Sequence, residues 1–353
     1  MINKIRYIIT DETDPYKNLA LEEYLFHRVG ASELLLYLWQ NERTVVIGRN
    51  QNPWKECKVS ALEEDRGKLV RRLSGGGAVF HDLGNLNFTF LVSKENYNLE
   101  RQLEVIVRAV NKLGIPAIKS GRNDITVEGR KFSGNAFYSD GVHSYHHGTI
   151  LVHVDMSKLS HYLNVSREKL ISKGVDSVRS RVTNLTEYLQ DLTIDRMKEA
   201  LITGLGEVYG LSPEPLRRES MDIPEPLQQE NTDLSEPLQR ESMDLPKLKL
   251  LEEKFSSWEW NYGKKLNFSD SFSRRFSWGD LELQLVVNNG SIQECAIYSD
   301  ALETGLFEMM AGKLIGCPYR GAEMAKTLKE TPIDAEKEPI LTDIIALIQE
   351  EGI

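Results

Sequence analysis

The chain has 353 residues, of which 41% are hydrophobic and 27% charged, and a formal net charge of −10 at pH 7. The length allows two globular domains, and the net negative charge argues against a broad nucleic-acid surface. No apolar run approaches the ~18 residues of a membrane helix. The three cysteines, Cys57, Cys295 and Cys317, are widely spaced, and the N-terminus lacks the apolar core of a signal peptide. We therefore expect a cytoplasmic protein that does not associate with a membrane.

The first half of the chain mixes helical and strand patterns without a regular βαβ rhythm. Asp14 before Pro15 is typical of a helix N-cap with proline in the first turn, and predicts a helix over residues 15–28. Further helices are expected over residues 53–65, 99–113 and most of 155–210, and strands over residues 34–39, 44–47 (joined at Asn41-Glu42), 68–73, 86–92, 124–127, 131–137 and 146–152. These patterns predict an α+β fold with a mixed, largely antiparallel sheet and flanking helices.

An eleven-residue unit occurs three times in the middle of the chain, at residues 213–223, 224–234 and 235–245. Each copy contains proline and few apolar residues, which argues against a supercoiled helix. Residues 211–246 hold nine acidic and three basic side chains, a net charge of −6. This composition is typical of an extended, solvated linker, and we favour a spacer over a partner-binding segment.

The linker divides the chain into a domain over residues 1–210 and a smaller one over residues 247–353. The second unit is rich in aromatic residues, and Asn289-Gly290 between two apolar runs predicts a β-hairpin. Helical patterns over residues 302–314 and 340–350 follow the hairpin. We therefore expect a small α+β C-terminal domain.

Residues 71–85 combine two arginines with three consecutive glycines. Glycine can adopt positive φ and lets the backbone approach a ligand, so the amides of Gly75, Gly76 and Gly77 could face an anion. Arg72 could add a planar donor fork that matches phosphate or carboxylate. A flexible hairpin turn is the alternative. Neither Gly-x-x-x-x-Gly-Lys-Ser/Thr nor Gly-x-Gly-x-x-Gly occurs, so a nucleotide site would be of another type.

Lys131 lies in a second region with candidate ligand-binding residues. It follows the turn at Glu128-Gly129 and precedes a run of small residues over 133–136, which would let a ligand lie close to the strand. A lysine there could act as a point charge on a phosphate, or could be a solvated hairpin lysine. Asn123-Asp124 could bind ribose, an amine or Mg²⁺, or could cap a turn.

Other polar residues are weaker candidates. His146 and His147 point to opposite faces of a strand, so they cannot easily chelate one ion, and a structural or ligand-packing role is favoured. His81-Asp82 could suggest a catalytic dyad, but no serine or cysteine is tied to it by a recognisable motif. Cys57 could be a nucleophile, but a buried, inert thiol is favoured.

Several motifs in fixed order resemble those of the lipoate–protein ligase A family. They are Arg71-Arg72-x-Ser74-Gly75-Gly76-Gly77-Ala78-Val79-Phe80-His81-Asp82-Leu83-Gly84-Asn85, Gly121-Arg122-Asn123-Asp124, Lys131-x-Ser133-Gly134, His146-His147-Gly148-Thr149 and Ser177-Val178-Arg179-Ser180-Arg181. Ser257-Trp258-Glu259-Trp260 and Arg275-Phe276-x-Trp278-Gly279 resemble the family's C-terminal accessory domain. The resemblance covers nearly the whole chain except the repeat.

The resemblance implies an ATP-dependent ligase that shares its catalytic fold with biotin–protein ligases. ATP, with Mg²⁺, and free lipoate would give lipoyl-AMP and pyrophosphate. The lipoyl group would then pass to a lysine of an acceptor protein. In the family the acceptors are lipoyl domains of 2-oxoacid dehydrogenase E2 subunits and the glycine cleavage H protein. No tightly bound prosthetic group is expected.

The family pattern also implies roles for individual residues. Lys131 would be the catalytic residue, lying between the lipoyl carbonyl oxygen and the α-phosphate. Arg72, Gly77, Ala78, Val79, Phe80, Asn123 and Asp124 would bind ATP and lipoyl-AMP, with Asp124 as the candidate Mg²⁺ contact, and His81, Ser74 and Gly76 would join Lys131 in binding lipoate.

Three other functions stay open. An octanoyltransferase of the same superfamily would act without ATP through a cysteine thioester, with Cys57 as its candidate nucleophile. A biotin ligase would need a different substrate slot. A non-catalytic module would bind lipoate or nucleotide without turnover. The intact lysine, arginine and glycine motifs favour the ligase. The repeat is expected to be dispensable, because a longer flexible tether lowers effective concentration only slowly.

Overall fold

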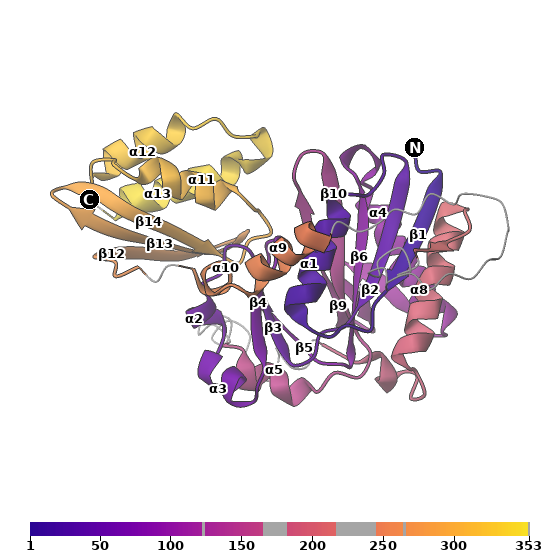
Figure 1. Ribbon diagram of the computed structural model, residues 1–353. Coiled ribbons are helices and arrows are strands. Elements are labelled where there is room, and N and C mark those ends of the chain that lie inside the picture. The colour runs from indigo at the N-terminus through magenta and orange to yellow at the C-terminus, as the bar shows by residue number, and fades with distance from the viewer. Residues whose placement is uncertain (122–123, 165–181, 217–244, 264–265, 352–353) are drawn as a thin grey trace, which may run out of the picture.

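The computed structural model describes residues 1–121, 124–164, 182–216, 245–263 and 266–351. Two units lie side by side in Figure 1, with the C-terminal unit in orange and yellow. The motif at residues 177–181 and most of the repeat fall outside the described residues. The first copy of the repeat begins inside them, where β11 (Glu214–Pro215) pairs with the edge of the main sheet.

Within the described residues, eight strands form one large sheet in the order β11-β1-β2-β6-β10-β9-β8-β7. The pairs of β1 with β11 and with β2 are parallel, and the remaining pairs are antiparallel. Its other strands are β1 (Lys4–Ile9), β2 (Glu33–Trp39), β6 (Asn85–Ser93), β7 (Ala117–Ser120), β8 (Asp124–Val127), β9 (Arg130–Ser139) and β10 (His143–Leu151). The predicted α+β class with a largely antiparallel sheet is therefore confirmed.

Helices cover both faces of this sheet (Figure 1). α4 (Leu99–Lys112) and α8 (Ile194–Tyr209) pack on one face, where alternate residues of β2 such as Leu36 meet Phe88 and Phe90. α1 (Pro15–Phe26) packs on the other face against the intervening residues of β2, including Tyr37. Because side chains alternate along a strand, β2 is buried on both sides, and after Glu33 its residues are all apolar or aromatic.

A second sheet, in the order β4-β3-β5, is formed by β3 (Thr44–Ile47), β4 (Lys68–Arg71) and β5 (Val79–His81). The strands predicted over residues 34–39 and 44–47 exist, but they belong to different sheets. The segment 53–65 forms two short helices, α2 (Pro53–Glu56) and α3 (Val59–Glu64), and α5 (Met156–Tyr162) packs near them. The glycine-rich segment connects β4 to β5 and so lies at the edge of the second sheet.

The C-terminal unit contains the antiparallel sheet β12-β13-β14 and three α-helices among its described residues. Asn289 and Gly290 have φ values of 50° and 75° in the predicted hairpin between β13 and β14. The elements are β12 (Asp270–Phe276), β13 (Gly279–Asn288), β14 (Ser291–Ser299), α11 (Leu306–Leu314), α12 (Gly321–Lys329) and α13 (Glu338–Glu350). Sequence patterns did not predict β12 or α12, whereas the hairpin, α11 and α13 are confirmed.

Two helices connect the units. α9 (Leu245–Ser256) packs against α1, where Phe255 is buried and Lys254 forms an ion pair with Glu23 at 2.6 Å. α10 (Trp258–Tyr262) lies against β4. Residues 245–262 thus pack on the N-terminal unit, although they directly precede the C-terminal one.

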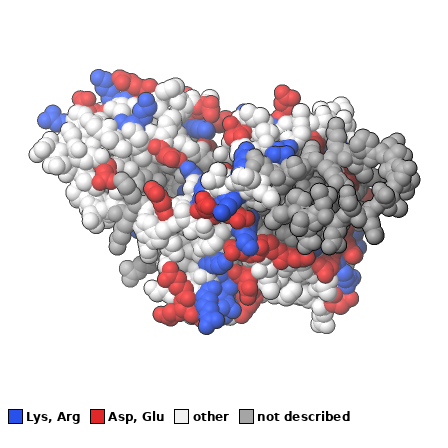
Figure 2. All heavy atoms as spheres, viewed as in Figure 1, with Lys and Arg blue, Asp and Glu red and all other residues white. Residues whose placement is uncertain are grey.

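Acidic and basic side chains are interspersed over the described part of the face in Figure 2. Many of them form surface ion pairs such as Lys17 with Glu12 at 2.9 Å. No helix among the described residues is long and apolar enough to span a bilayer.

Candidate active site

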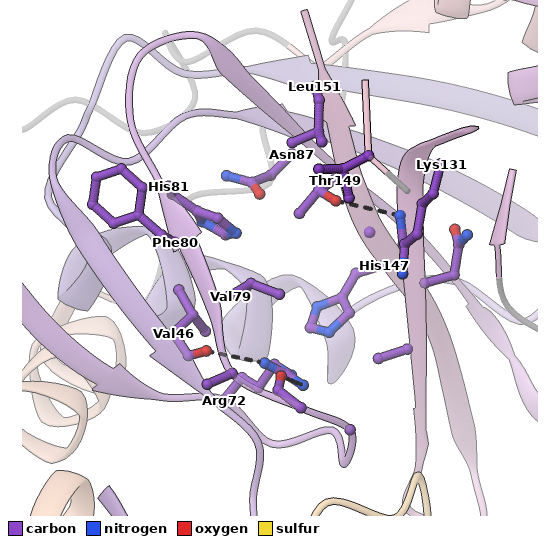
Figure 3. A pocket seen from close by; sticks show the side chains of 18 of the residues that line it. Val46, Arg72, Val79, Phe80, His81, Asn87, Lys131, His147, Thr149 and Leu151 are labelled. Carbon is purple, nitrogen blue, oxygen red and sulfur yellow. Dashed lines mark hydrogen bonds between the residues drawn. The ribbon is translucent and has the colours of Figure 1, made fainter. Parts of the chain in front are cut away.

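A cavity of about 310 Å³ lies between strands of the large sheet and the second sheet. Its volume is in the range of small-molecule sites. Its walls come from α1, β2, β3, β5, β6, β9 and β10, and from the glycine loop, which is the segment 72–78 between β4 and β5 (Figure 3). The lining residues include Leu19, Trp39, Val46, Arg72, Gly76, Gly77, Ala78, Val79, Phe80, His81, Asn87, Lys131, Gly134, Asn135, Ala136, His147, Gly148, Thr149, Leu151 and Leu302. The cavity therefore has an apolar part and a part rich in hydrogen-bonding groups.

The glycine loop is shaped by close backbone contacts. Gly76 has φ +92°, a conformation that favours glycine. A Cβ at Gly48, on the neighbouring strand end, would lie 2.1 Å from the carbonyl oxygen of Gly76. A Cβ at Gly75 would lie 2.5 Å from the carbonyl oxygen of Ala301 in the C-terminal unit. Glycine at 48 and 75 thus lets the loop pack between β3 and the C-terminal unit.

Arg72 organises this loop from inside. Its Nε donates to Ser74 Oγ at 3.0 Å and its Nη2 to the carbonyl oxygens of Gly75 and Gly77 at 2.7 and 2.9 Å. Burial lowers the pKa of Arg72 to about 10, so the guanidinium stays charged at neutral pH. Arg72 lines the cavity as expected, but these loop carbonyls already accept from it.

Arg71 points away from the cavity and is not among its lining residues. Its guanidinium donates to the carbonyl oxygens of Gln51, Trp260 and Asn261 at 2.7 to 2.9 Å, and the Trp260 indole donates to its carbonyl oxygen at 2.8 Å. Consecutive residues leave a strand in opposite directions. Arg71 therefore binds α10 to β4, while Arg72 faces the cavity.

Lys131 reaches the cavity from β9 (Figure 3). Its Nζ lies 2.7 Å from Asp124 Oδ1 on the neighbouring strand β8. A Cβ at Gly134 would lie 2.8 Å from Lys131 Nζ, so glycine leaves the space that the ammonium group occupies. The small residues after Lys131 therefore accommodate the lysine side chain itself.

A buried chain of hydrogen bonds supports the loop from the side of the large sheet. His147 Nε2 lies 2.7 Å from Ser74 Oγ, and its Nδ1 lies 2.9 Å from Glu22 Oε1 on α1. Thr89 also donates to Glu22 Oε1, at 2.6 Å. These contacts link Glu22 through His147 and Ser74 to Arg72, so four elements fix the position of the arginine.

His81 lies at the end of β5 and is almost completely buried. Burial lowers its pKa to about 3, with a smaller effect of the nearby Arg72 charge, and the ring is neutral at pH 7. Asn41 Nδ2 lies 3.3 Å from His81 Nδ1, which places the ring proton on Nε2. Nε2 is buried without a hydrogen-bond partner in the described structure, so it is a free donor beside the cavity.

The structure brings together most of the residues named from sequence. Arg72, Gly76, Gly77, Ala78, Val79, Phe80, His81 and Lys131 line the cavity. Ser74 lies behind His147, and Asp124 contacts Lys131 without lining the cavity. Asn123 lies outside the described residues.

Sequence reasoning missed Glu22, Trp39, Asn87 and Leu302. Glu22 and Asn87 could have been found as polar residues in an otherwise buried helix and strand, whereas Trp39 does not differ in this way from the other apolar residues of β2. Nothing in the local pattern indicated Leu302, because it reaches the cavity only through the packing of the C-terminal unit.

The two histidines of β10 separate as expected. His146 packs on Phe90 in the core, with ring centroids 5.7 Å apart, and burial holds its pKa well below the usual range. His147 lines the cavity. Cys57 is buried away from the cavity, and burial raises its pKa to about 12, as expected of an inert thiol.

Two family models match the chain. The lipoyl protein ligase A/B catalytic domain matches residues 14–206, and the C-terminus of bacterial lipoate protein ligase matches residues 265–348.

Solved structures agree with these matches. LipL1 of P. falciparum, crystallised in complex with lipoate, is 28% identical with a TM-score of 0.80, covering 98% of this chain and 99% of that one. The bipartite lipoate protein ligase of Thermoplasma acidophilum, studied with its E2 lipoyl domain, is 26% identical with a TM-score of 0.61, covering 75% and 99%. Lipoate-protein ligase A bound with ATP is 25% identical with a TM-score of 0.59, covering 74% and 99%.

Because the catalytic-domain model matches more than half of the chain, the chain belongs to the lipoyl protein ligase A/B family, and it carries the C-terminal domain of the bacterial lipoate protein ligases.

Proposed function

We propose that this protein is an ATP-dependent, AMP-forming lipoate–protein ligase. The observation that carries the proposal is a single cavity that joins the Lys131 ammonium and the glycine-loop backbone to an apolar wall. A cation and backbone amides suit a carboxylate next to a phosphate, and an apolar wall suits the lipoyl tail. Neighbours with lipoate and with ATP support the same pairing of ligands.

In the first step, the lipoate carboxylate attacks the α-phosphorus of ATP, and the bond to pyrophosphate breaks. Negative charge grows on the α-phosphate oxygens, where Lys131 stabilises it electrostatically. The backbone of Gly77, Ala78, Val79 and Phe80 holds the nucleotide, and Arg72 keeps this loop in shape. His81 Nε2 lies beside the lipoyl group.

In the second step, the amine of an acceptor lysine attacks the lipoyl carbonyl carbon. AMP leaves, the amine loses a proton, and an amide bond results. Lys131 lies next to the departing phosphate and serves both steps. The acceptor is a lipoyl domain of a 2-oxoacid dehydrogenase E2 subunit or the glycine cleavage H protein, and the T. acidophilum ligase with its E2 lipoyl domain supports this class.

Mg²⁺ would enter with ATP. Such ions are commonly held by one or two carboxylates together with substrate phosphates. Asp124 is the carboxylate next to Lys131 that fits this arrangement. Asn123 stays a proposed nucleotide-binding residue from the sequence. The ion would supply charge neutralisation of the phosphates, and no tightly bound prosthetic group is needed.

The domain division at residues 1–210, 211–246 and 247–353, and a cytoplasmic location, belong to the same proposal. Within the last segment, α9 and α10 pack on the first domain. The three free cysteines support a reducing compartment. If the repeat is a spacer, a chain lacking residues 224–245 should retain ligation, and loss of ligation by a folded deletion variant would contradict this.

The decisive experiment is mass spectrometry of an apo lipoyl domain incubated with the protein, ATP, Mg²⁺ and lipoate. The acceptor should gain one lipoyl group, with release of pyrophosphate. Lys131→Ala should lower lipoyl-AMP formation by about 10²-fold or more. Lys119→Ala, which removes a surface lysine paired with Glu100, is the matched control and should be fully active.

Three results would favour other functions. Transfer without ATP that is lost in Cys57→Ser would indicate an octanoyltransferase. Labelled biotin on the acceptor would indicate a biotin ligase. Binding of lipoate and ATP without pyrophosphate release would indicate a non-catalytic module.

A further inference from the structure

His27, Asp140 and His143 converge at the surface where α1 ends beside the turn between β9 and β10. His27 Nδ1 lies 3.6 Å from Asp140 Oδ2, and His143 Nδ1 lies 3.8 Å from the same oxygen. All three atoms lie within 4.8 Å of one another. None of these residues lines the cavity described above, so the cluster is a separate feature.

The β9–β10 turn holds the carboxylate in place. Asp140 Oδ1 accepts hydrogen bonds from the backbone amides of Val142 and His143 at 2.8 and 2.7 Å. The second oxygen, Oδ2, is thereby directed to the imidazoles. The ring of Phe26 packs edge-on against both histidines, with centroids 5.0 and 5.6 Å away, and restricts their orientation.

The spacing of the three atoms favours a metal ion over a hydrogen-bonded cluster. Separations of 3.6 and 3.8 Å are too long for hydrogen bonds. They are close to the ~3.3 Å between ligands of a tetrahedral ion with bonds of ~2.0 Å. His143 Nδ1 is also buried and has no hydrogen-bond partner, although it points toward the carboxylate.

We propose that His27, Asp140 and His143 form a binding site for a divalent transition-metal ion of the zinc class, with water as the fourth ligand. Two imidazole nitrogens and one carboxylate oxygen suit Zn²⁺, whereas Mg²⁺ prefers oxygen ligands.

The ion would connect α1 to the β9–β10 hairpin. α1 carries Glu22, which holds His147, and β9 carries Lys131. Both strands of the hairpin contribute cavity residues, so the metal would stabilise the wall of the cavity without contacting a molecule bound in the cavity.

Isothermal titration calorimetry of the full chain with ZnCl₂ tests the site directly. The native protein should bind one Zn²⁺, and His27→Ala and Asp140→Asn should each weaken binding by about tenfold or more. Asp140→Asn keeps an oxygen for the turn and removes the anionic ligand. His161→Ala is the matched control, because His161 also lies 3.8 Å from an aspartate, Asp65, and should leave the affinity unchanged.

Thermal unfolding supplies a second measurement. Zn²⁺ should raise the Tm of the native chain and of His161→Ala, because a ligand that binds only the folded state stabilises it. It should not raise the Tm of His27→Ala or Asp140→Asn. Equal zinc affinity in the native chain and these two variants, or no binding to the native chain, would overturn the proposal.

Discussion

Lys131 Nζ and Asp124 Oδ1 lie 2.7 Å apart on neighbouring strands, and the two side chains are 36% and 38% exposed. An ion pair this exposed contributes little to folding stability. Its effect is instead to hold the ammonium group at one position at the edge of the cavity, beside the glycine loop.

Asp124→Asn should therefore separate stability from catalysis. We expect the free energy of unfolding to change by less than about 1 kcal/mol. Under the proposed function, the KM for MgATP should rise about tenfold or more, since a contact to a charged group is worth ~1.5–3 kcal/mol. Steady-state pyrophosphate release at varied MgATP measures this, and an unchanged KM would argue against Asp124 as the magnesium contact.

Gly134→Ala should displace the catalytic lysine while the sheet stays folded. The new Cβ would lie 2.8 Å from Lys131 Nζ and Cε, which are the flexible end of a side chain and can move. We expect lipoyl-AMP formation to fall about tenfold or more, because a displaced Lys131 ammonium stabilises the negative charge that develops on the α-phosphate less well. Gly312→Ala, with nothing within 4 Å, is the control and should retain activity.

Gly75→Ala should loosen the C-terminal unit from the glycine loop. The added Cβ would lie 2.5 and 2.6 Å from the carbonyl oxygens of Ala301 and Leu302, and backbone atoms cannot yield as a side chain does. The hydrogen bond from the Gly76 amide to Ala301, now 2.8 Å, should break. Small-angle X-ray scattering should report a larger radius of gyration.

The matched control for this change is Gly77→Ala, two residues away in the same loop. Nothing lies within 4 Å of a Cβ there, so the radius of gyration should stay native. An identical radius in the two variants would mean that the contact between Gly75 and Ala301 does not hold the units together.

His81 should make the protein less stable in acid. Its folded pKa is lowered to about 3, below the usual ~6.5 of the unfolded chain. The neutral ring therefore contributes stability that is fully present above pH ~6.5 and declines as the pH falls toward 3, by up to ~1.4 kcal/mol per pH unit. Urea unfolding at several pH values between 7 and 4 measures the free energy of unfolding, which should fall less steeply with decreasing pH in His81→Asn than in the native chain. An equal pH dependence in the two proteins would contradict the lowered pKa.

The order of elements in the first domain could be predicted to a large extent from periodicity and capping. Asp14 does cap α1 by accepting from the Tyr16 amide at 3.0 Å, and β6 does bury Phe88 and Phe90 on one face. β5 was not predicted, because a three-residue strand carries no periodic signal. The pairing of β3 with β4 and β5, rather than with β2, depends on contacts that local patterns do not encode.

The sequence by itself identified the α+β class, the glycine loop, Lys131 and the family, because glycine runs, lone charges and ordered motifs are local properties. Only the tertiary structure decided that Arg71 binds α10 while Arg72 faces the cavity, and that Leu302 closes one side of it. It also decided that His27 lies beside His143, from which it is separated by more than a hundred residues in the sequence. Each of these relationships arises when distant segments pack together, and packing is set by the shapes of both partners.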